Sequence, residues 1–120
     1  MSYRLEMVAE VRTWLHDLRR ADRDTAVLIG QAITALLEEG PSLGRPLVDR
    51  IKASRLHNLK ELRPASRGGS EVRILFIFDP DRCAVLLVAG DKAGRWSAWY
   101  RQAIPLAEAR YDIYRKEQEG

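Results

Sequence analysis

The spacing of apolar residues changes along the chain, and each change marks a new predicted element. Residues 3–7 alternate apolar and charged side chains, which predicts a short half-buried strand. From Val8 the apolar positions recur at helical spacing, and a second stripe of this kind covers residues 26–37. Asp22 or Asp24 can cap the second helix, and a Gly-Pro pair ends it. The chain therefore begins with a predicted strand and helical hairpin.

The remaining pattern predicts strands followed by one more helix. Residues 41–56 have no regular period and indicate an irregular connection, whereas residues 57–63 alternate weakly. Residues 71–78 and 82–89 are rich in β-branched and aromatic side chains and predict a β-hairpin. Pro105 suits the first position of a last helix. The fold class is α+β, with the N-terminal strand and helical hairpin packed on a mainly antiparallel sheet and the C-terminal segment covering the other face.

Composition indicates the number of domains and the compartment to expect. With 120 residues and 46% hydrophobic residues, the chain predicts a single folded domain spanning 1–120. The lone Cys83 lies in an apolar run and has no cysteine to pair with, which favours a reducing compartment. The sequence shows no signal peptide and no apolar stretch of membrane-spanning length. We therefore expect a cytoplasmic protein without a membrane partner.

Basic residues are concentrated in the middle of the chain. The net charge is only +3, but residues 45–73 hold eight cations against three acidic residues. Such a cluster attracts polyanions, and a solvated arginine-rich surface is the alternative reading.

Three of these distant cations are expected to meet at one edge of the sheet. If the hairpin turn is centred on residues 80–81, Arg73 lies opposite Val88, and Lys92 lies at the same end. Arg63 reaches that end too if the glycine-rich loop of residues 65–70 joins segments 57–63 and 71–78 as an antiparallel pair. Clustered cations can stabilise the charge that develops on a phosphodiester during cleavage. Surface ion pairs with neighbouring carboxylates remain the alternative.

Few residues are available to move a proton. Glu61 shares a strand face with Arg63, so it is either a general base or the ion-pair partner of that arginine. His16 is expected on the helix surface, and His57 lies near the basic connection. No metal-ligand spacing and no phosphate-binding loop is recognisable, so we expect no metal and no cofactor.

Aromatic and basic residues interleave after the last strand, a pattern typical of sites that stack single-stranded RNA bases. We expect Trp99 to pack in the core and either Trp96 or Tyr100 to face solvent. The predicted RNA contacts are Lys60, Arg67, Arg95, Trp96 and His57.

Several segments together resemble the RelE/ParE toxin superfamily, and within it the HigB-like, phage Gp49-like branch. They are residues 59–63 (LKELR), 72–76 (VRILF) and 85–92 (VLLVAGDK), supported by 36–47 and 99–111. The resemblance covers nearly the whole chain.

The resemblance implies a compact, curved RelE-like sheet and a type II toxin that cleaves mRNA on the ribosome. It also implies a helix-turn-helix antitoxin encoded nearby, whose complex with the toxin binds operator DNA. By position, Arg63, Arg73 and Lys92 would hold the scissile phosphate, with Tyr100 assisting proton transfer. The alternatives are a ParE-like toxin that binds gyrase and a non-catalytic module that binds the antitoxin or DNA.

Overall fold

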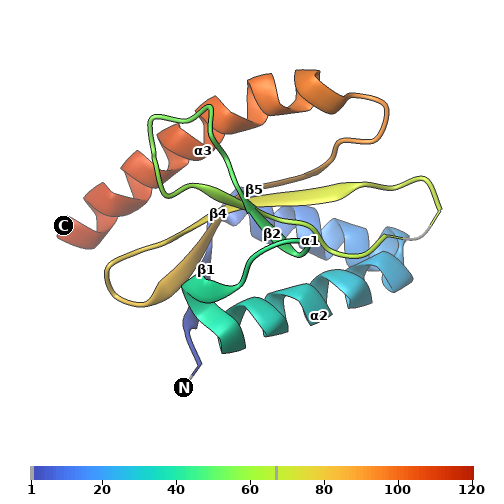
Figure 1. Ribbon diagram of the computed structural model, residues 1–120, viewed down its shortest axis with the longest axis horizontal. Coiled ribbons are helices and arrows are strands. Elements are labelled where there is room, and N and C mark those ends of the chain that lie inside the picture. Colours follow the sequence, from blue (N-terminus) through green and yellow to red (C-terminus); the bar gives the residue numbers. More distant parts are fainter. Residues whose placement is uncertain (1, 67) are drawn as a thin grey trace.

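The computed structural model describes residues 2–66 and 68–120 and has an α+β architecture (Figure 1). One five-stranded sheet, in the order β1-β5-β4-β3-β2, lies between two helical layers. The elements in chain order are β1 (Arg4–Met7), α1 (Ala9–Ala21), α2 (Arg23–Glu39), the 3-10 turn η1 (Gly40–Ser42), β2 (Val48–Arg50), β3 (Lys60–Leu62), β4 (Val72–Phe78), β5 (Cys83–Asp91) and α3 (Trp96–Glu119).

The predicted helical hairpin is confirmed. Val11 of α1 and Ile29 and Leu36 of α2 are buried against one face of the sheet. Asp22, rather than Asp24, caps α2, because its carboxylate accepts the backbone N–H of Thr25 at 3.2 Å. Gly40 ends the helix at φ 71°, where a side chain would collide with the ring of Tyr3.

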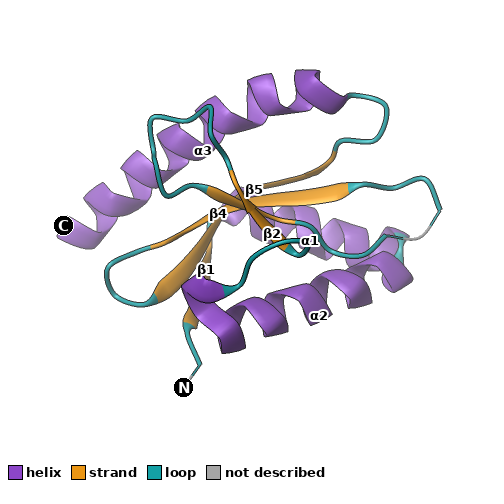
Figure 2. Cartoon of the chain, viewed as in Figure 1, coloured by secondary structure: helices purple, strands orange, loops and turns teal. Residues whose placement is uncertain are grey.

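The C-terminal helix covers the opposite face of the sheet, as Figure 2 shows. It begins at Trp96, so the prediction that Pro105 opens it was wrong. Proline removes one backbone donor within the helix. Burial of Trp99, Ala103 and Ala107 against the sheet keeps the helix continuous through that position. Among the described residues, no helix combines the length and the apolar character needed to cross a bilayer.

Two features of the sheet differ from the predictions. The connection expected to be irregular contains β2, which pairs antiparallel with β3, whereas β1 runs parallel to β5. Arg73 lies opposite Gly90 instead of Val88. Because the hairpin turn is centred on Asp81, with Phe78 opposite Ala84, each partner on β5 lies one position later than expected, and a β-bulge adds a further residue on β5.

The bulge places two consecutive side chains, Leu87 and Val88, on the face covered by α3. The carbonyl of Leu87 accepts a hydrogen bond from Nη1 of Arg110 on α3 at 2.9 Å. Arg110 in turn lies 3.6 Å from the carboxylate of Glu10 on α1. Arg110 of α3 therefore contacts both the bulge in β5 and helix α1 on the other face of the sheet.

Gly90 allows α3 to approach the sheet closely. A Cβ atom at this position would lie 2.6 Å from Nε1 of Trp99. We expect Gly90→Ala to lower the free energy of unfolding by about 1–3 kcal/mol through overpacking, measured by urea denaturation. The matched control is Gly30→Ala in α2, where a Cβ would meet nothing within 4 Å and where alanine favours the helix. Equal stability of Gly90→Ala and the parent chain would show that α3 is not held at this distance.

Candidate functional site

A buried carboxylate marks the candidate site. The Glu61 residue is 3% exposed and lies in the middle of β3, between Asp49 of β2 and Leu75 of β4. Strand alternation places Glu61 on the α3 face, together with the buried side chains of Leu59 and Leu75. A charge buried in this way requires close partners, because the protein interior solvates it poorly.

Arg63 is more closely bound to Glu61 than Arg73 is. Its Nη2 lies 2.9 Å from Oε2 of Glu61 and 3.1 Å from Oδ2 of Asp49. Burial alone would lower the pKa of Arg63, but the hydrogen bond and charge of Glu61 raise the pKa above its ordinary value. Arg63 is therefore a fixed cation held between two carboxylates.

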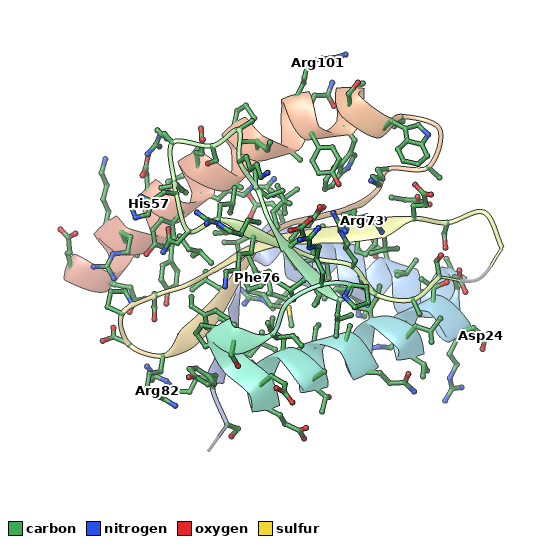
Figure 3. The ribbon with its side chains drawn as sticks, viewed as in Figure 1. Asp24, His57, Arg73, Phe76, Arg82 and Arg101 are labelled. Carbon is green, nitrogen blue, oxygen red and sulfur yellow. The ribbon has the colours of Figure 1, made fainter. Side chains whose placement is uncertain are left out.

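Arg73 is held more loosely. Its Nε lies 3.9 Å from Oε1 of Glu61, beyond hydrogen-bond distance, and Nη1 donates to the carbonyl of Val72 at 2.8 Å. Its Nε is buried and has no hydrogen-bond partner among the described residues. The Arg73 side chain is half-buried, whereas Arg101 is exposed and points outward from α3 (Figure 3). Arg73 thus retains donor capacity that an anion could use.

Tyr100 and Lys92 complete the cluster from α3 and from the segment before it. The Tyr100 hydroxyl donates to Oε1 of Glu61 at 2.6 Å, and Nζ of Lys92 donates to the Tyr100 oxygen at 3.2 Å. Burial, followed by the hydrogen bond and charge of Glu61, raises the pKa of Tyr100 to about 12. Burial and the nearby charge of Arg73 lower the pKa of Lys92. A continuous hydrogen-bonded chain therefore joins the ammonium, the phenol and the carboxylate.

Trp96 forms an exposed edge of this cluster. It is 59% exposed, and its ring centroid lies 4.8 Å from Nζ of Lys92. Its backbone has a positive φ of 37°, unusual for a bulky residue, and is held by a hydrogen bond from its N–H to the carbonyl of Lys92. Trp99 is buried, as expected, so the exposed aromatic surface belongs to Trp96.

The structure brings five of the predicted site residues together, with Trp96 at their edge, and places His57, Lys60 and Arg95 elsewhere. The cluster contains Glu61, Arg63, Arg73, Lys92 and Tyr100. His57 is exposed, and its carbonyl accepts a hydrogen bond from Arg50. Lys60 lies on the opposite face of the sheet, and Arg95 donates to Gln102 on α3. Arg67 lies outside the described residues.

Asp49 is the member of the cluster that the sequence analysis missed. It pairs with Glu61 across the β2–β3 ladder, so both carboxylates reach Arg63. The alternation of Val48, Asp49 and Arg50 was the available signal, but three residues are too few to identify a strand. Across residues 2–66 and 68–120, no three His, Cys, Asp or Glu side chains gather where they could hold a metal ion.

Comparison with a solved structure defines the fold class. A double mutant of the E. coli toxin RelE in its free state superposes with a TM-score of 0.62, covering 88% of this chain and 97% of that one at 12% identity. The chain therefore has the RelE fold. Residues 16–112 match the family described as phage derived protein Gp49-like (DUF891), and the chain belongs to this family.

Two relatives from Mycobacterium tuberculosis bear names that designate them as toxins. HigB3 is 45% identical over 114 residues, which cover 95% of both chains. HigB2 is 54% identical over 101 residues, which cover 84% of this chain and 49% of HigB2. The chain thus spans about half the length of HigB2 and almost all of HigB3.

The contact between Tyr100 and Glu61 predicts a titration that can be measured. Glu61→Gln should shift the pKa of Tyr100 down from about 12 toward its ordinary value of 10.0, because the amide carries no charge. The raised pKa should stabilise the fold below about pH 10 and lose that effect as the pH rises toward 12. Ultraviolet absorbance of the phenolate, compared with Tyr100→Phe, isolates this residue.

The control for this titration is Glu38→Gln, which removes an exposed carboxylate from α2 on the other side of the sheet. It should leave the pKa of Tyr100 unchanged. An identical Tyr100 titration in Glu61→Gln and the parent chain would mean that the hydrogen bond does not form in solution.

Proposed function

We propose that this chain is the toxin of a type II toxin-antitoxin pair and that it cleaves mRNA on the ribosome without a metal ion. The proposal rests on one observation: Arg73 and Lys92 gather around the buried Glu61 with donor capacity to spare. The similarity to proteins named as HigB toxins supports the assignment as a toxin. The site brings the cations Arg63, Arg73 and Lys92 close to the carboxylates of Glu61, Asp49 and Glu71, and clustered arginine and lysine donors suit the charge of a phosphodiester.

The burial of Glu61 decides how a proton can move. Both oxygens of its carboxylate are already engaged, Oε1 by Tyr100 and Oε2 by Arg63, whereas Tyr100 is partly exposed. We assign Tyr100 as the group that takes the proton from the 2′-hydroxyl while passing its own proton to Glu61 over 2.6 Å. Because the pKa of Tyr100 is about 12, the phenol is neutral at physiological pH and needs this carboxylate to act as a base.

The proposed reaction is a transesterification at phosphorus. The 2′-oxygen forms a bond to the phosphorus, the bond to the 5′-oxygen breaks, and Lys92 protonates the departing oxygen. The products are a 2′,3′-cyclic phosphate and a 5′-hydroxyl. Glu61 then returns its proton to Tyr100, which passes one to Lys92 along the same hydrogen bonds, so the protons balance over one turnover. Arg63 and Arg73 stabilise the charge on the nonbridging oxygens.

The exposed ring of Trp96 gives the site a surface on which a base next to the scissile phosphate can stack. Arg95, at the start of the same helix, is placed to contact the RNA backbone. We assign Lys60, Arg67 and His57 to more distant RNA contacts.

The partners follow from the toxin assignment. We propose that a helix-turn-helix antitoxin encoded nearby neutralises the chain in the cytoplasm. Operator DNA would be bound only by the complex of the two proteins. The ribosome would present the mRNA strand to the site.

Removal of Arg73 tests the cleavage site. Arg73→Ala should reduce RNA cleavage and growth inhibition by about 100-fold or more, because the variant has no donor for the developing charge at this position. The measurements are toxicity on induction and mapping of transcript ends. Arg73→Lys keeps the charge but not the planar fork, and it should restore part of the activity.

The matched control is Arg101→Ala, which removes an arginine that points outward from α3. It should be as toxic as the parent, and circular dichroism should show that both variants are folded. Undiminished toxicity of folded Arg73→Ala would remove the basis for the proposed site. A DNA-damage response with continuing translation would instead indicate a gyrase-binding toxin.

A further inference from the structure

A second basic site lies on the other face of the β2–β3 edge. A cavity of about 330 Å³ is bounded by η1, the loop after it, β2 and β3, and three of its lining residues are Arg45, Arg50 and Lys60. Strand alternation places Arg50 and Lys60 on the face of Val48 and Leu62, away from Glu61. The basic segment therefore divides its cations between the two faces of the sheet.

The register of the two strands points to an anionic ligand. Arg50 and Lys60 are directly paired in the antiparallel ladder, so two like charges lie opposite each other. Such a pair destabilises a sheet unless something between the charges compensates them. An anion bound in the cavity would remove this repulsion.

Both side chains are already held in place. Nζ of Lys60 donates to the carbonyl of Pro41 at 3.1 Å, and Nη2 of Arg50 donates to the carbonyl of His57 at 3.2 Å. Each contact uses part of the donor capacity, since an ammonium has three donors and a guanidinium has five. The remaining donors are available to a phosphate without a large loss of side-chain freedom.

Asp49 also lines this cavity, but its carboxylate is engaged with Arg63 on the α3 face of the sheet. Oδ2 of Asp49 accepts from Arg63, and Oδ1 accepts the backbone N–H of Arg50. Asp49 therefore compensates the cation of the cluster on the α3 face and leaves the cavity positively charged. It also joins the two sites, because Asp49 and Arg50 are adjacent in β2.

We propose that Arg45, Arg50 and Lys60 form a second phosphate-binding subsite, which holds the backbone of the RNA strand on the far side of the β2 edge from the cleavage site. This inference rests on the proposed function for the identity of the ligand. Single-stranded RNA is favoured over an acidic protein segment because the cavity adjoins the cluster through Asp49 and Glu61, where the same strand would be cleaved.

The test measures RNA binding separately from cleavage. The probe is a fluorescent single-stranded RNA of about 12 nucleotides with 2′-O-methyl riboses, which has no free 2′-hydroxyl and is not cut. The triple variant Arg45→Ala/Arg50→Ala/Lys60→Ala should bind it about tenfold or more weakly than the parent. The slope of log affinity against log salt concentration should decrease by about 0.7 for each phosphate that the variant no longer binds.

The matched control removes three exposed arginines at the junction of α1 and α2, as Arg19→Ala/Arg20→Ala/Arg23→Ala. It has the same net charge as the test variant, so general attraction is reduced equally. If the triple variant fails to fold, the single variants Arg50→Gln and Lys60→Gln are compared with Arg20→Gln, an exposed position whose substitution gives the same net charge. Equal affinities and salt slopes for the test and control variants would overturn the subsite.

Two further outcomes separate this inference from the cleavage proposal. Suppose that Arg73→Ala remains toxic and that the triple variant at Arg45, Arg50 and Lys60 binds RNA more weakly than its control. The proposed cleavage site is then wrong, and the subsite stands. If the cavity variant binds RNA like the control but escapes neutralisation by the antitoxin, the RNA subsite is overturned and the cavity binds an acidic protein segment.

Discussion

The pairing of one buried carboxylate with cations from separate strands is the interaction on which the arrangement of this molecule depends. Glu61 is almost fully buried, and an uncompensated charge there would be strongly destabilising. Its partners are Arg63 directly after β3, Arg73 of β4 and Tyr100 of α3. The sheet order and the position of the last helix must therefore both be correct before this charge is satisfied. Because the buried charge of Glu61 needs partners from several elements, the positions of these side chains are fixed before any ligand binds.

The bulge in β5 connects this site to the packing of the helices. By adding a residue at Leu87, it moves Gly90 opposite Arg73, where the absence of a side chain lets Trp99 lie against the strand. Tyr100 follows Trp99 in the helix and reaches Glu61 from there. Arg110 satisfies the Leu87 carbonyl about three helical turns later. A local irregularity of the backbone thus sets the distance between the helix and the sheet at the site.

The sequence patterns predicted the elements whose apolar side chains are buried at regular spacing. They missed the β-bulge, the short strand β2 and the start of α3, which depend on local backbone geometry. Apolar periodicity located both N-terminal helices and the β4–β5 hairpin, and Trp99 is buried as expected for an aromatic residue near the last helix. Turn geometry predicted that Arg63, Arg73 and Lys92 converge, and they do, although Arg73 lies opposite a different residue. A bulge leaves no mark on hydrophobic alternation, because Leu87 and Val88 are both apolar. Asp49 was missed with its short strand, and the start of α3 was misplaced because proline was treated as a helix start.

The division of cations between the two faces of β2 and β3 has a consequence for the kind of nucleic acid that fits. If the cluster at Glu61 and the cavity at Lys60 hold one strand, its backbone must turn around the edge of the sheet at β2. Duplex DNA is stiff over ~150 base pairs. The free energy needed to bend it sharply over a few phosphates would exceed the binding free energy gained from three cations. An unpaired RNA strand bends freely and exposes its bases for stacking on Trp96. Under the proposed binding mode, cations on both faces of the sheet would select single strands over duplexes, with no contact to a base edge required.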